Sequence, residues 1–246
     1  MLFLYKNRQL VRIKVIQIFQ SDLLMKKLTL LFLFLCMGYT ASAQIEIGLL
    51  VSPSVTSNRF IAEDRHGFKQ ESAGLGLGLG IVADYFFAQN YALSTGLVYR
   101  SKGSKISYLV PDDTMIGTPE RKQDDLSVHY LEVPATIKLF TNEIAPATIL
   151  YFQAGSSLNT KVAASVNDKK VLADGKKSSS RFNIFEVDAL IGAGTEVQLG
   201  QSTKLVGGVS YHRGLTNIDD YYQDLLDDKN IAIKNQSFSI NLGVKF

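Results

Sequence analysis

The chain contains few of the residues on which disulfides, metal sites and many enzymes depend. Its 246 residues include one cysteine, Cys36, three histidines and no tryptophan. One cysteine cannot form an intrachain disulfide or supply the several thiolates of a cysteine-ligated zinc site. The histidines, at positions 66, 129 and 212, do not have the close spacing of metal ligands. We therefore predict that the protein holds no cofactor and no metal.

Apolar runs long enough to form a membrane-spanning helix are also missing. The longest run, Leu28 to Met37, has about ten residues, half of the ~20 that a spanning helix needs. Two lysines precede this run, and the small residues Ala41-Ser42-Ala43 follow it. This order is typical of a secretory signal peptide. We predict a signal peptide at residues 25–43, with cleavage between Ala43 and Gln44.

Residues 1–24 fit no targeting pattern, and we expect Met25 to be the true first residue and the preceding extension to reflect a gene-start error. Residues 1–43 hold six of the 26 basic residues and one of the 23 acidic residues, which leaves 20 basic and 22 acidic residues in 44–246. The net charge of the mature chain is then about −2, compared with +3 for the full sequence. A basic surface for nucleic acid is not expected, so we predict no nucleic-acid partner.

Alternation of apolar and polar residues is the dominant pattern after residue 44. In the four clearest segments the odd positions are almost all apolar and none is charged, whereas the even positions hold glycines and charged residues. A period of two predicts β-strands with one apolar face. A charge on a lipid-facing wall would cost about 2–4 kcal/mol, which explains the exclusion. These segments are Leu75–Phe87, Tyr91–Tyr99, Leu131–Leu139 and Phe185–Leu199.

The last eleven residues show the strictest alternation. An aromatic residue at the end of such a strand is typical of the closing strand of a bacterial outer-membrane β-barrel, which the barrel-assembly machinery recognises. We therefore expect this strand to be an assembly signal and the assembly machinery to be a partner. Its apolar positions are Phe238, Ile240, Leu242, Val244 and Phe246.

Three weaker segments bring the number of predicted strands to about eight. Their connections alternate between short and long, as do the periplasmic turns and outer loops of outer-membrane barrels. We predict that residues 44–246 form one domain, an all-β, closed antiparallel transmembrane β-barrel located in the cell outer membrane, with lipids as its surroundings. The weaker segments are Ile45–Thr56, Thr148–Lys161 and Thr203–Thr216; the short connections are 88–90, 142–147 and 200–202; the long ones are roughly 57–73, 103–125, 162–181 and 217–235.

The polar positions of these strands predict a charged barrel interior. A barrel of about eight strands is just wide enough for side chains to fill. We therefore interpret the charges as a structural salt-bridge network rather than an ion or proton path. Pro134 would remove a hydrogen bond from a paired strand, which predicts a β-bulge there. The predicted interior residues are Asp84, Arg100, Glu132, Lys138, Glu186, Asp188, Glu196, Lys204 and Lys245.

Two alternatives are less consistent with the sequence than this interpretation. A soluble β-sandwich or lipocalin-like barrel needs large apolar side chains on its inner face, but the predicted inner face carries glycines at 74, 76, 78 and 80. An outer-membrane lipid-modifying enzyme would need a histidine beside a nucleophile. His129 and His212 each follow a serine by two residues, Ser127 and Ser210, but neither pair lies in a recognisable motif. We predict no catalytic residues and no enzyme activity.

The long connections are the predicted sites of interaction. The last one, 216–230, is acidic but lacks the ligand spacing of an EF-hand loop. We interpret it as a solvated loop in which four apolar and aromatic residues could contact a partner. The loop at 111–125 is mixed in charge and is expected to be mobile. Tyrosines and phenylalanines are expected to form the aromatic girdles. The four loop residues are Tyr221, Tyr222, Leu225 and Leu226; the girdle candidates are Tyr85, Phe87, Tyr91, Tyr99 and Tyr211.

Several strings resemble the PorT-like outer-membrane β-barrel family, which is common in Bacteroidota. They are YLEVPATIKLF at 130–140, YFQAGSSLN at 151–159, GAGTEVQL at 192–199 and YHRGLTNI at 211–218. The resemblance covers the whole mature chain and implies a barrel of eight strands with the up-and-down topology of OmpA and OmpX. It does not imply an activity. One branch of the family takes part in protein secretion across the outer membrane.

The expected function is a structural or interaction role through the outer loops, with a protein partner at those loops. The alternative is a component of a machine for protein secretion or surface assembly across the outer membrane. A lipid-modifying enzyme is the less favoured third reading.

Overall fold

The computed structural model of the protein describes residues 44–110, 119–171 and 177–246. The predicted signal peptide, its Ala43 cleavage residue and the extension before Met25 lie outside the described residues. Residues 44–246 form one compact unit. No helix in the described ranges has both the length and the apolar character needed to cross a membrane.

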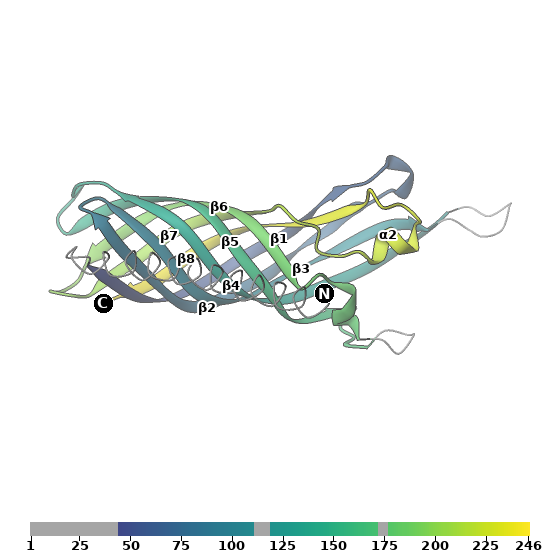
Figure 1. Ribbon diagram of the computed structural model, residues 1–246, viewed down its shortest axis with the longest axis horizontal. Helices are drawn as coiled ribbons and strands as arrows, with labels where there is room; N and C mark the ends of the chain where they lie inside the picture. Colours follow the sequence, from purple (N-terminus) through teal and green to yellow (C-terminus); the bar gives the residue numbers. More distant parts are fainter. Residues whose placement is uncertain (1–43, 111–118, 172–176) are drawn as a thin grey trace, which may run out of the picture. The chain divides into compact units, whose positions relative to one another are not determined.

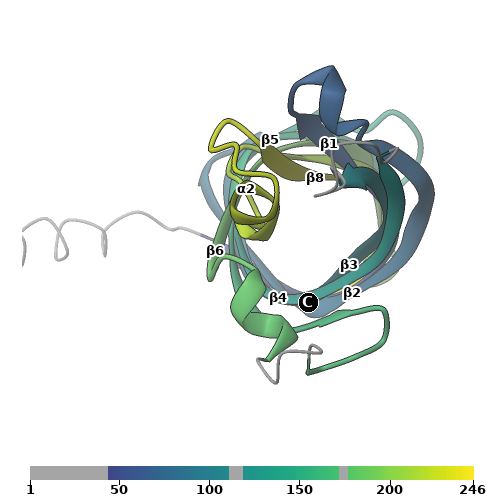
Figure 2. The ribbon, with the colours of Figure 1, turned by 90° about the vertical axis from the view of Figure 1, so that its right-hand side faces the viewer.

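Eight antiparallel strands close into a barrel in which each strand pairs with its neighbours in the sequence and β1 pairs with β8 (Figures 1 and 2). This confirms the predicted fold and topology. The strands are β1 (Ile45–Ile61), β2 (Lys69–Ala88), β3 (Tyr91–Val110), β4 (Glu120–Phe140), β5 (Thr148–Val166), β6 (Phe185–Gln198), β7 (Lys204–Gly214) and β8 (Ala232–Lys245). Among the described residues, three short helical segments lie between strands: η2 (Asp64–His66), η3 (Ser178–Arg181) and α2 (Tyr221–Leu225).

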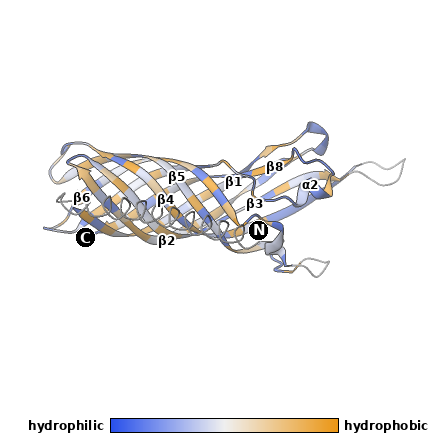
Figure 3. Ribbon diagram, in the orientation of Figure 1, coloured by the Kyte–Doolittle hydropathy of each residue, from blue (hydrophilic) through white to orange (hydrophobic). Residues whose placement is uncertain are grey.

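The outer wall of the barrel is apolar over the part that crosses the membrane. Outward side chains such as Leu49, Ile137 and Leu242 are half exposed or more, at 58%, 50% and 53%. Orange positions recur along the strands in Figure 3, where they alternate with blue ones. A continuous apolar wall of this kind would be unfavourable in water and is the face that a bilayer covers. The apolar positions of the sequence pattern are therefore the lipid-facing ones.

The apolar side chains change from the outward face to the inward face where the long strands leave the membrane. On β3, Lys105 is exposed and its neighbour Ile106 is buried, and on β4 Leu126 is buried between half-exposed Asp125 and Ser127. The inner face has become apolar and the outer face polar, as in a soluble barrel. Strands β2, β3 and β4 have 20, 20 and 21 residues, about twice the 9–11 needed to cross a membrane.

This inversion corrects the predicted loops. Much of the predicted connections 57–73 and 103–125 is strand, because β1 reaches Ile61, β2 begins at Lys69, β3 reaches Val110 and β4 begins at Glu120. Residues 111–118, within the loop expected to be mobile, lie outside the described residues. The short turns remain at the opposite end of the barrel, so by the usual asymmetry the extended end is the outer one.

The β-bulge predicted at Pro134 is wrong. The register between β4 and β5 passes through Pro134, which pairs with Ser157, without a shift, and the shift lies instead between His129 and Tyr130. The strand tolerates the missing N–H because the pairing with β3 skips this position, and the Thr95 hydroxyl donates to the Pro134 carbonyl over 2.9 Å.

The glycines of β2 allow the neighbouring strand to approach closely. A Cβ atom at Gly80 would lie 2.3 Å from the Leu97 carbonyl oxygen, and one at Gly78 would lie 3.2 Å from the Arg100 guanidinium. The register between β2 and β3 also shifts between Ala73 and Gly78. Small residues on this face therefore leave room for the large Arg100 side chain inside the barrel.

Candidate functional site

The barrel interior is filled by charged side chains, all of them on the polar positions of the strands. Eight of the predicted interior residues are buried, with exposed fractions of 6% or less, and Lys204 is slightly more exposed, with 19% of its side chain accessible. The structure brings them together in three groups at successive levels of the lumen. The eight are Asp84, Arg100, Glu132, Lys138, Glu186, Asp188, Glu196 and Lys245.

The first group lies near the short-turn end. Lys138 Nζ is 3.0 Å from Asp84 Oδ2, and Lys245 pairs with both Asp84 and Glu196. Lys204 pairs with Glu46, a residue that the sequence reasoning left out although it lies on the inward positions of β1. Six strands thereby contribute to one network, because Lys204 also lies near Glu196 and Lys245 near Glu46, and each buried charge has a partner of opposite sign.

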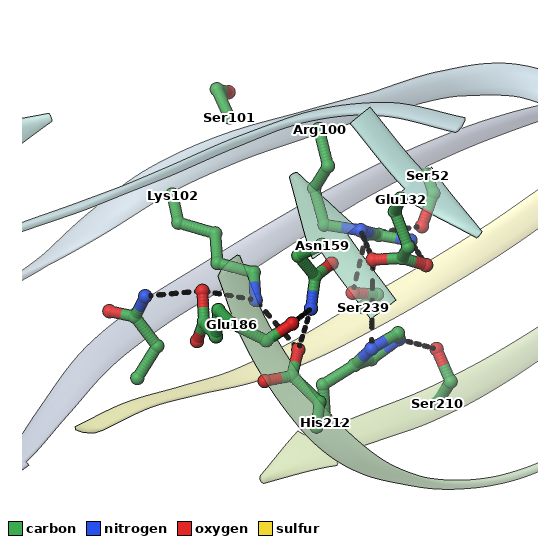
Figure 4. Close-up of polar contacts among 12 residues, drawn as sticks. Ser52, Arg100, Ser101, Lys102, Glu132, Asn159, Glu186, Ser210, His212 and Ser239 are labelled. Atoms are coloured by element: carbon green, nitrogen blue, oxygen red, sulfur yellow. Dashed lines mark hydrogen bonds and ion pairs between the residues drawn. The ribbon is translucent and has the colours of Figure 1, made fainter. Parts of the chain in front are cut away.

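The second group lies deeper in the lumen and is centred on one arginine (Figure 4). Arg100 Nε donates to Glu132 Oε2 over 2.8 Å, and Arg100 Nη2 donates to Glu132 Oε1 over 3.3 Å. Two parallel bonds of this kind give the strong, planar form of an arginine–carboxylate pair. The remaining Nη1 lies 3.3 Å from the Ser239 hydroxyl.

The third group is built around Lys102, which the predicted network omitted. Lys102 Nζ lies 2.7 Å from Asp188 Oδ2 and 3.3 Å from Glu186 Oε2. Asn159 donates to Asp188 over 3.0 Å, and Asn235 donates to Glu186 over 3.1 Å. Lys102 shares the inward parity of Arg100, which was the signal available in the sequence.

A small cavity separates the first group from the second. It has a volume of about 60 Å³, and its lining includes Ser94, Thr136, Ser210 and Asn241. A buried water needs roughly 10–15 Å³ measured in this way, so the cavity has room for a few waters. It is far too small for a lipid chain or a hydrated ion pathway through the barrel.

The two predicted serine–histidine pairs have different surroundings. His212 is buried, with Nε2 3.4 Å from the Ser210 hydroxyl and Nδ1 3.9 Å from Glu132 Oε2. His129 instead faces outward and stacks on Tyr99, with ring centroids 5.7 Å apart. Ser210, His212 and Glu132 follow one another like a nucleophile, its base and the carboxylate that orients the base. The distance of 3.9 Å between His212 Nδ1 and Glu132 Oε2 is, however, too long for a hydrogen bond. Within the described ranges, no three His, Cys, Asp or Glu side chains are grouped as metal ligands would be.

The outer end of the lumen is closed by an apolar core. This core forms where residues 215–231, including α2, pack against inward side chains of the extended strands, and we call residues 215–231 the outer cap. Tyr222 is fully buried, and its ring lies 4.9 Å from that of Tyr108 and 5.4 Å from that of Phe68. Figure 2 looks along the barrel from this end and shows α2 at the rim. The buried residues of this core are Ile106, Tyr108, Leu126, Val128, Tyr130, Ala164, Val166, Phe182, Ile218, Tyr222, Leu226, Ile231 and Ile233.

Ion pairs fasten the outer cap to two other connections. Arg181, on η3, donates through Nε to Asp219 Oδ2 over 2.6 Å, and its Nη2 lies 3.0 Å from Asp124 Oδ2. The Arg181 guanidinium also lies 4.4 Å from the centre of the Tyr222 ring. On the other side, His66 Nε2 lies 2.9 Å from Asp228 Oδ2. Burial raises the pKa of Asp219 to about 6, against the opposing effect of the Arg181 charge.

These contacts correct the interpretation of 216–230 as a solvated loop. Asp219 and Asp228 are buried because cationic or polar partners from other connections reach them. Of the four residues suggested as a partner surface, Tyr222 and Leu226 are buried in the core, and only Tyr221 and Leu225 are exposed, at 37% each. Both the loop's acidity and its aromatic content therefore stabilise the closed end.

Comparisons with known proteins agree with the architecture. Residues 40–220 match the family model described as "Outer membrane protein beta-barrel domain". No curated protein matches the chain in sequence. The outer membrane protein OprG from Pseudomonas aeruginosa is 12% identical, with 83% of this chain and 96% of that chain covered and a TM-score of 0.50.

Two further solved structures are similar at lower TM-scores. Neisserial surface protein A (NspA) is 14% identical, with 81% of this chain and 95% of that chain covered and a TM-score of 0.46. The attachment invasion locus protein Ail of Yersinia pestis is 14% identical, with 82% and 99% covered and a TM-score of 0.41.

Proposed function

Because the chain belongs to the family of outer membrane protein β-barrel domains, we propose that it is a non-conducting barrel whose outer half serves as an interaction surface. The observation that supports this is the contrast between its two parts. The lumen is filled by three groups of ion pairs and closed by the outer cap, whereas β3 and β4 project well beyond the lipid-facing wall with polar outward side chains.

The closed lumen argues against transport. Purified protein in planar bilayers should show no steady conductance. A steady conductance from correctly folded protein would contradict the proposal, whatever the partner.

The outer half can be tested with single cysteines, because residues 44–246 contain none. Lys105 projects from β3 on the outer half, with 59% of its side chain exposed. A thiol-reactive cross-linker at K105C should capture a partner in cells, and the matched control Q201C, in a short turn at the opposite end, should not. Equal capture at both positions, or none at several outer positions, would count against an outer interaction surface.

A second candidate is a component of a secretion or surface-assembly machine. It is supported by the resemblance of the strings at 130–140, 151–159, 192–199 and 211–218 to the PorT-like family of Bacteroidota. Gentle solubilisation should then recover the barrel in a stable complex. A lone heat-modifiable band would favour the free-standing interaction protein instead.

We also propose that the protein is not an enzyme. The Ser210–His212 pair faces a cavity of about 60 Å³, which cannot admit an acyl chain. The lipid A acylation pattern should therefore be the same in a deletion strain and in strains carrying S210A or H212A. A change that all three strains share would establish the lipid-modifying alternative.

The proposed assembly signal lies on the outward face of β8. Phe238, Ile240 and Leu242 are about half exposed to lipid, and Phe246 follows the strand with 60% exposure. We propose that the assembly machinery binds this face before the barrel closes. F246A should then lower the amount of folded protein in cells while leaving refolding into detergent micelles unchanged.

A further inference from the structure

Three cations lie side by side on the outside of the barrel, on β1, β7 and β8. Arg59 on β1 pairs in register with Lys234 on β8, and Arg213 on β7 pairs with Gln236, two residues closer to the membrane. All three occupy outward positions of their strands. We call Arg59, Arg213 and Lys234 the basic patch.

The cationic groups of the patch converge on one short segment. Arg59 reaches across β8, and its Nη2 donates to the Gly214 carbonyl over 3.0 Å. Lys234 Nζ donates to the next carbonyl, that of Leu215, over 2.6 Å. Arg213 immediately precedes these two residues. The carbonyl oxygens of Gly214 and Leu215 thus hold Arg59 and Lys234 close to Arg213. Three positive charges therefore lie close together.

No carboxylate neutralises this patch within the described part of the chain. Its cations take part in none of the ion pairs there, and Arg59 Nε is buried without a hydrogen-bond partner. Two exposed lysines elsewhere on the outer half do have acidic partners. Lys105 lies 3.4 Å from Asp125, and Lys122 lies 3.6 Å from Glu120. The patch is therefore a group of cations that no acidic side chain in the described part of the chain neutralises.

The patch lies at the outer edge of the lipid-facing wall. The wall residues Val55, Tyr211 and Phe238 lie two to four residues before the cations, and the exposed apolar residues Ile61 and Leu215 follow Arg59 and Arg213. At 3.3 Å per residue and a strand tilt of 35–45°, the cations lie about 5–10 Å beyond Val55, Tyr211 and Phe238 along the barrel axis. The headgroup layer of a bilayer extends over roughly that depth.

We propose that the basic patch binds the phosphate groups of the phosphorylated glycolipid in the outer leaflet of the outer membrane. Arginine recognises phosphate through two parallel N–H donors, and lysine adds a compact charge. The apolar wall directly below the patch contacts the acyl chains of the same lipid. One lipid molecule therefore contacts the apolar wall through its acyl chains and the basic patch through its phosphates.

The probe is bisphosphorylated lipid A in mixed micelles, added to the full folded barrel, with bound lipid counted by native mass spectrometry across a titration. Each cation near a charged membrane surface contributes about fivefold in affinity. R59Q/R213Q/K234Q should therefore weaken binding about a hundredfold, and R213Q alone about fivefold. K105Q removes a cation of the outer half that already has an acidic partner, and it should leave the affinity unchanged. Retained heat modifiability shows that each variant is folded.

Two further arms identify the ligand. Dephosphorylated lipid A should bind the native protein as weakly as the triple variant binds the bisphosphorylated form. Inorganic phosphate in large excess should not displace lipid A, because it lacks the acyl chains that contact the wall. Undiminished binding by the folded triple variant would overturn the proposal. So would equal binding of the two lipid A forms, or full displacement by inorganic phosphate, which would indicate a site for a soluble anion.

Discussion

Arg181 and Asp219 form a buried ion pair, with Nε and Oδ2 2.6 Å apart, that joins the connection after β5 to the connection before β8. Both side chains are at least nine-tenths buried. The pair lies at the outer end of the barrel, and the Tyr222 ring packs against the guanidinium. The closed state of the lumen therefore depends on contacts between residues far apart in the sequence.

Removal of Arg181 should open the outer cap without unfolding the barrel. Breaking a buried ion pair by removing one partner costs about 3–5 kcal/mol, because the other charge stays buried. In R181M, the amide protons of Ile218 and Leu226 should exchange about a hundredfold faster, while those of the membrane-spanning strands keep their rates. K122M, which removes an exposed pair with Glu120, is the control. Unchanged exchange in the cap would show that the apolar core alone holds it.

The outer cap should be more stable in mild acid than at neutral pH. The pKa of Asp219 is about 6 in the folded cap and 3.8 when exposed. Between these values the folded state binds more protons, so its stability falls as pH rises through 6. Full titration corresponds to about 3 kcal/mol. The pKa of Arg181 lies above its usual value, so the guanidinium stays charged throughout this range.

Near-ultraviolet circular dichroism of the buried tyrosines can follow this effect during thermal melting at pH 5 and pH 7.5. D219N mimics the protonated carboxyl and should remove the part of the pH dependence that Asp219 contributes, with a melting temperature near that of the native cap at pH 5. A native cap that is more stable at pH 7.5 would contradict the prediction.

Gly80 should tolerate no side chain. A Cβ atom there would lie 2.3 Å from the Leu97 carbonyl oxygen, and overpacking of this kind costs about 1–3 kcal/mol. G80A should therefore shift the urea unfolding midpoint downward and lower the folded fraction on heat-modifiability gels. Gly207, also on a membrane strand, has only the Thr195 hydroxyl at 3.9 Å, so G207A should behave as the native protein. Equal effects of the two variants would rule out the close approach as the cause.

Replacing Arg100 alone should lower the unfolding free energy more than replacing Arg100 and Glu132 together. R100M leaves Glu132 buried without its main partner and should cost about 3–5 kcal/mol of unfolding free energy. R100M/E132M removes both charges and should recover most of that loss. Urea titration of the two variants and E132M in lipid vesicles gives the double-mutant cycle. A double variant whose loss equals the sum of the losses in R100M and E132M would show that the two residues act independently.

The membrane-crossing part of the fold was predictable because lipid imposes a single rule on it. Outward positions such as Leu79, Leu97 and Ile137 must be apolar, and the inward charges follow from the period of two. The outer halves of the same strands were not predicted as strands because the alternation of apolar and polar residues inverts there. Ile106 and Leu126 are apolar at inward positions, which carry charges in the membrane-crossing half, so the sequence of those segments resembled loops.

Pairing inside the barrel depends on information that the alternation does not contain. Arg100 meets Glu132 on an adjacent strand, but Lys102 crosses the lumen from β3 to reach Asp188 on β6. Which strands face each other is set by the closure and register of the sheet. The contacts of Arg181 with Asp124 and Asp219 likewise require two connections and β4 to meet, which no local pattern predicts.

The inversion of the apolar face gives the two halves of each long strand different thermodynamics. The outer half buries its apolar residues away from water, so its melting carries a positive heat-capacity change and its stability weakens on cooling. The membrane half keeps its apolar wall in lipid throughout and has little such dependence. A single strand such as β3 thus combines a cold-sensitive end with a cold-insensitive one, and chilling should loosen the outer mouth before it affects the wall.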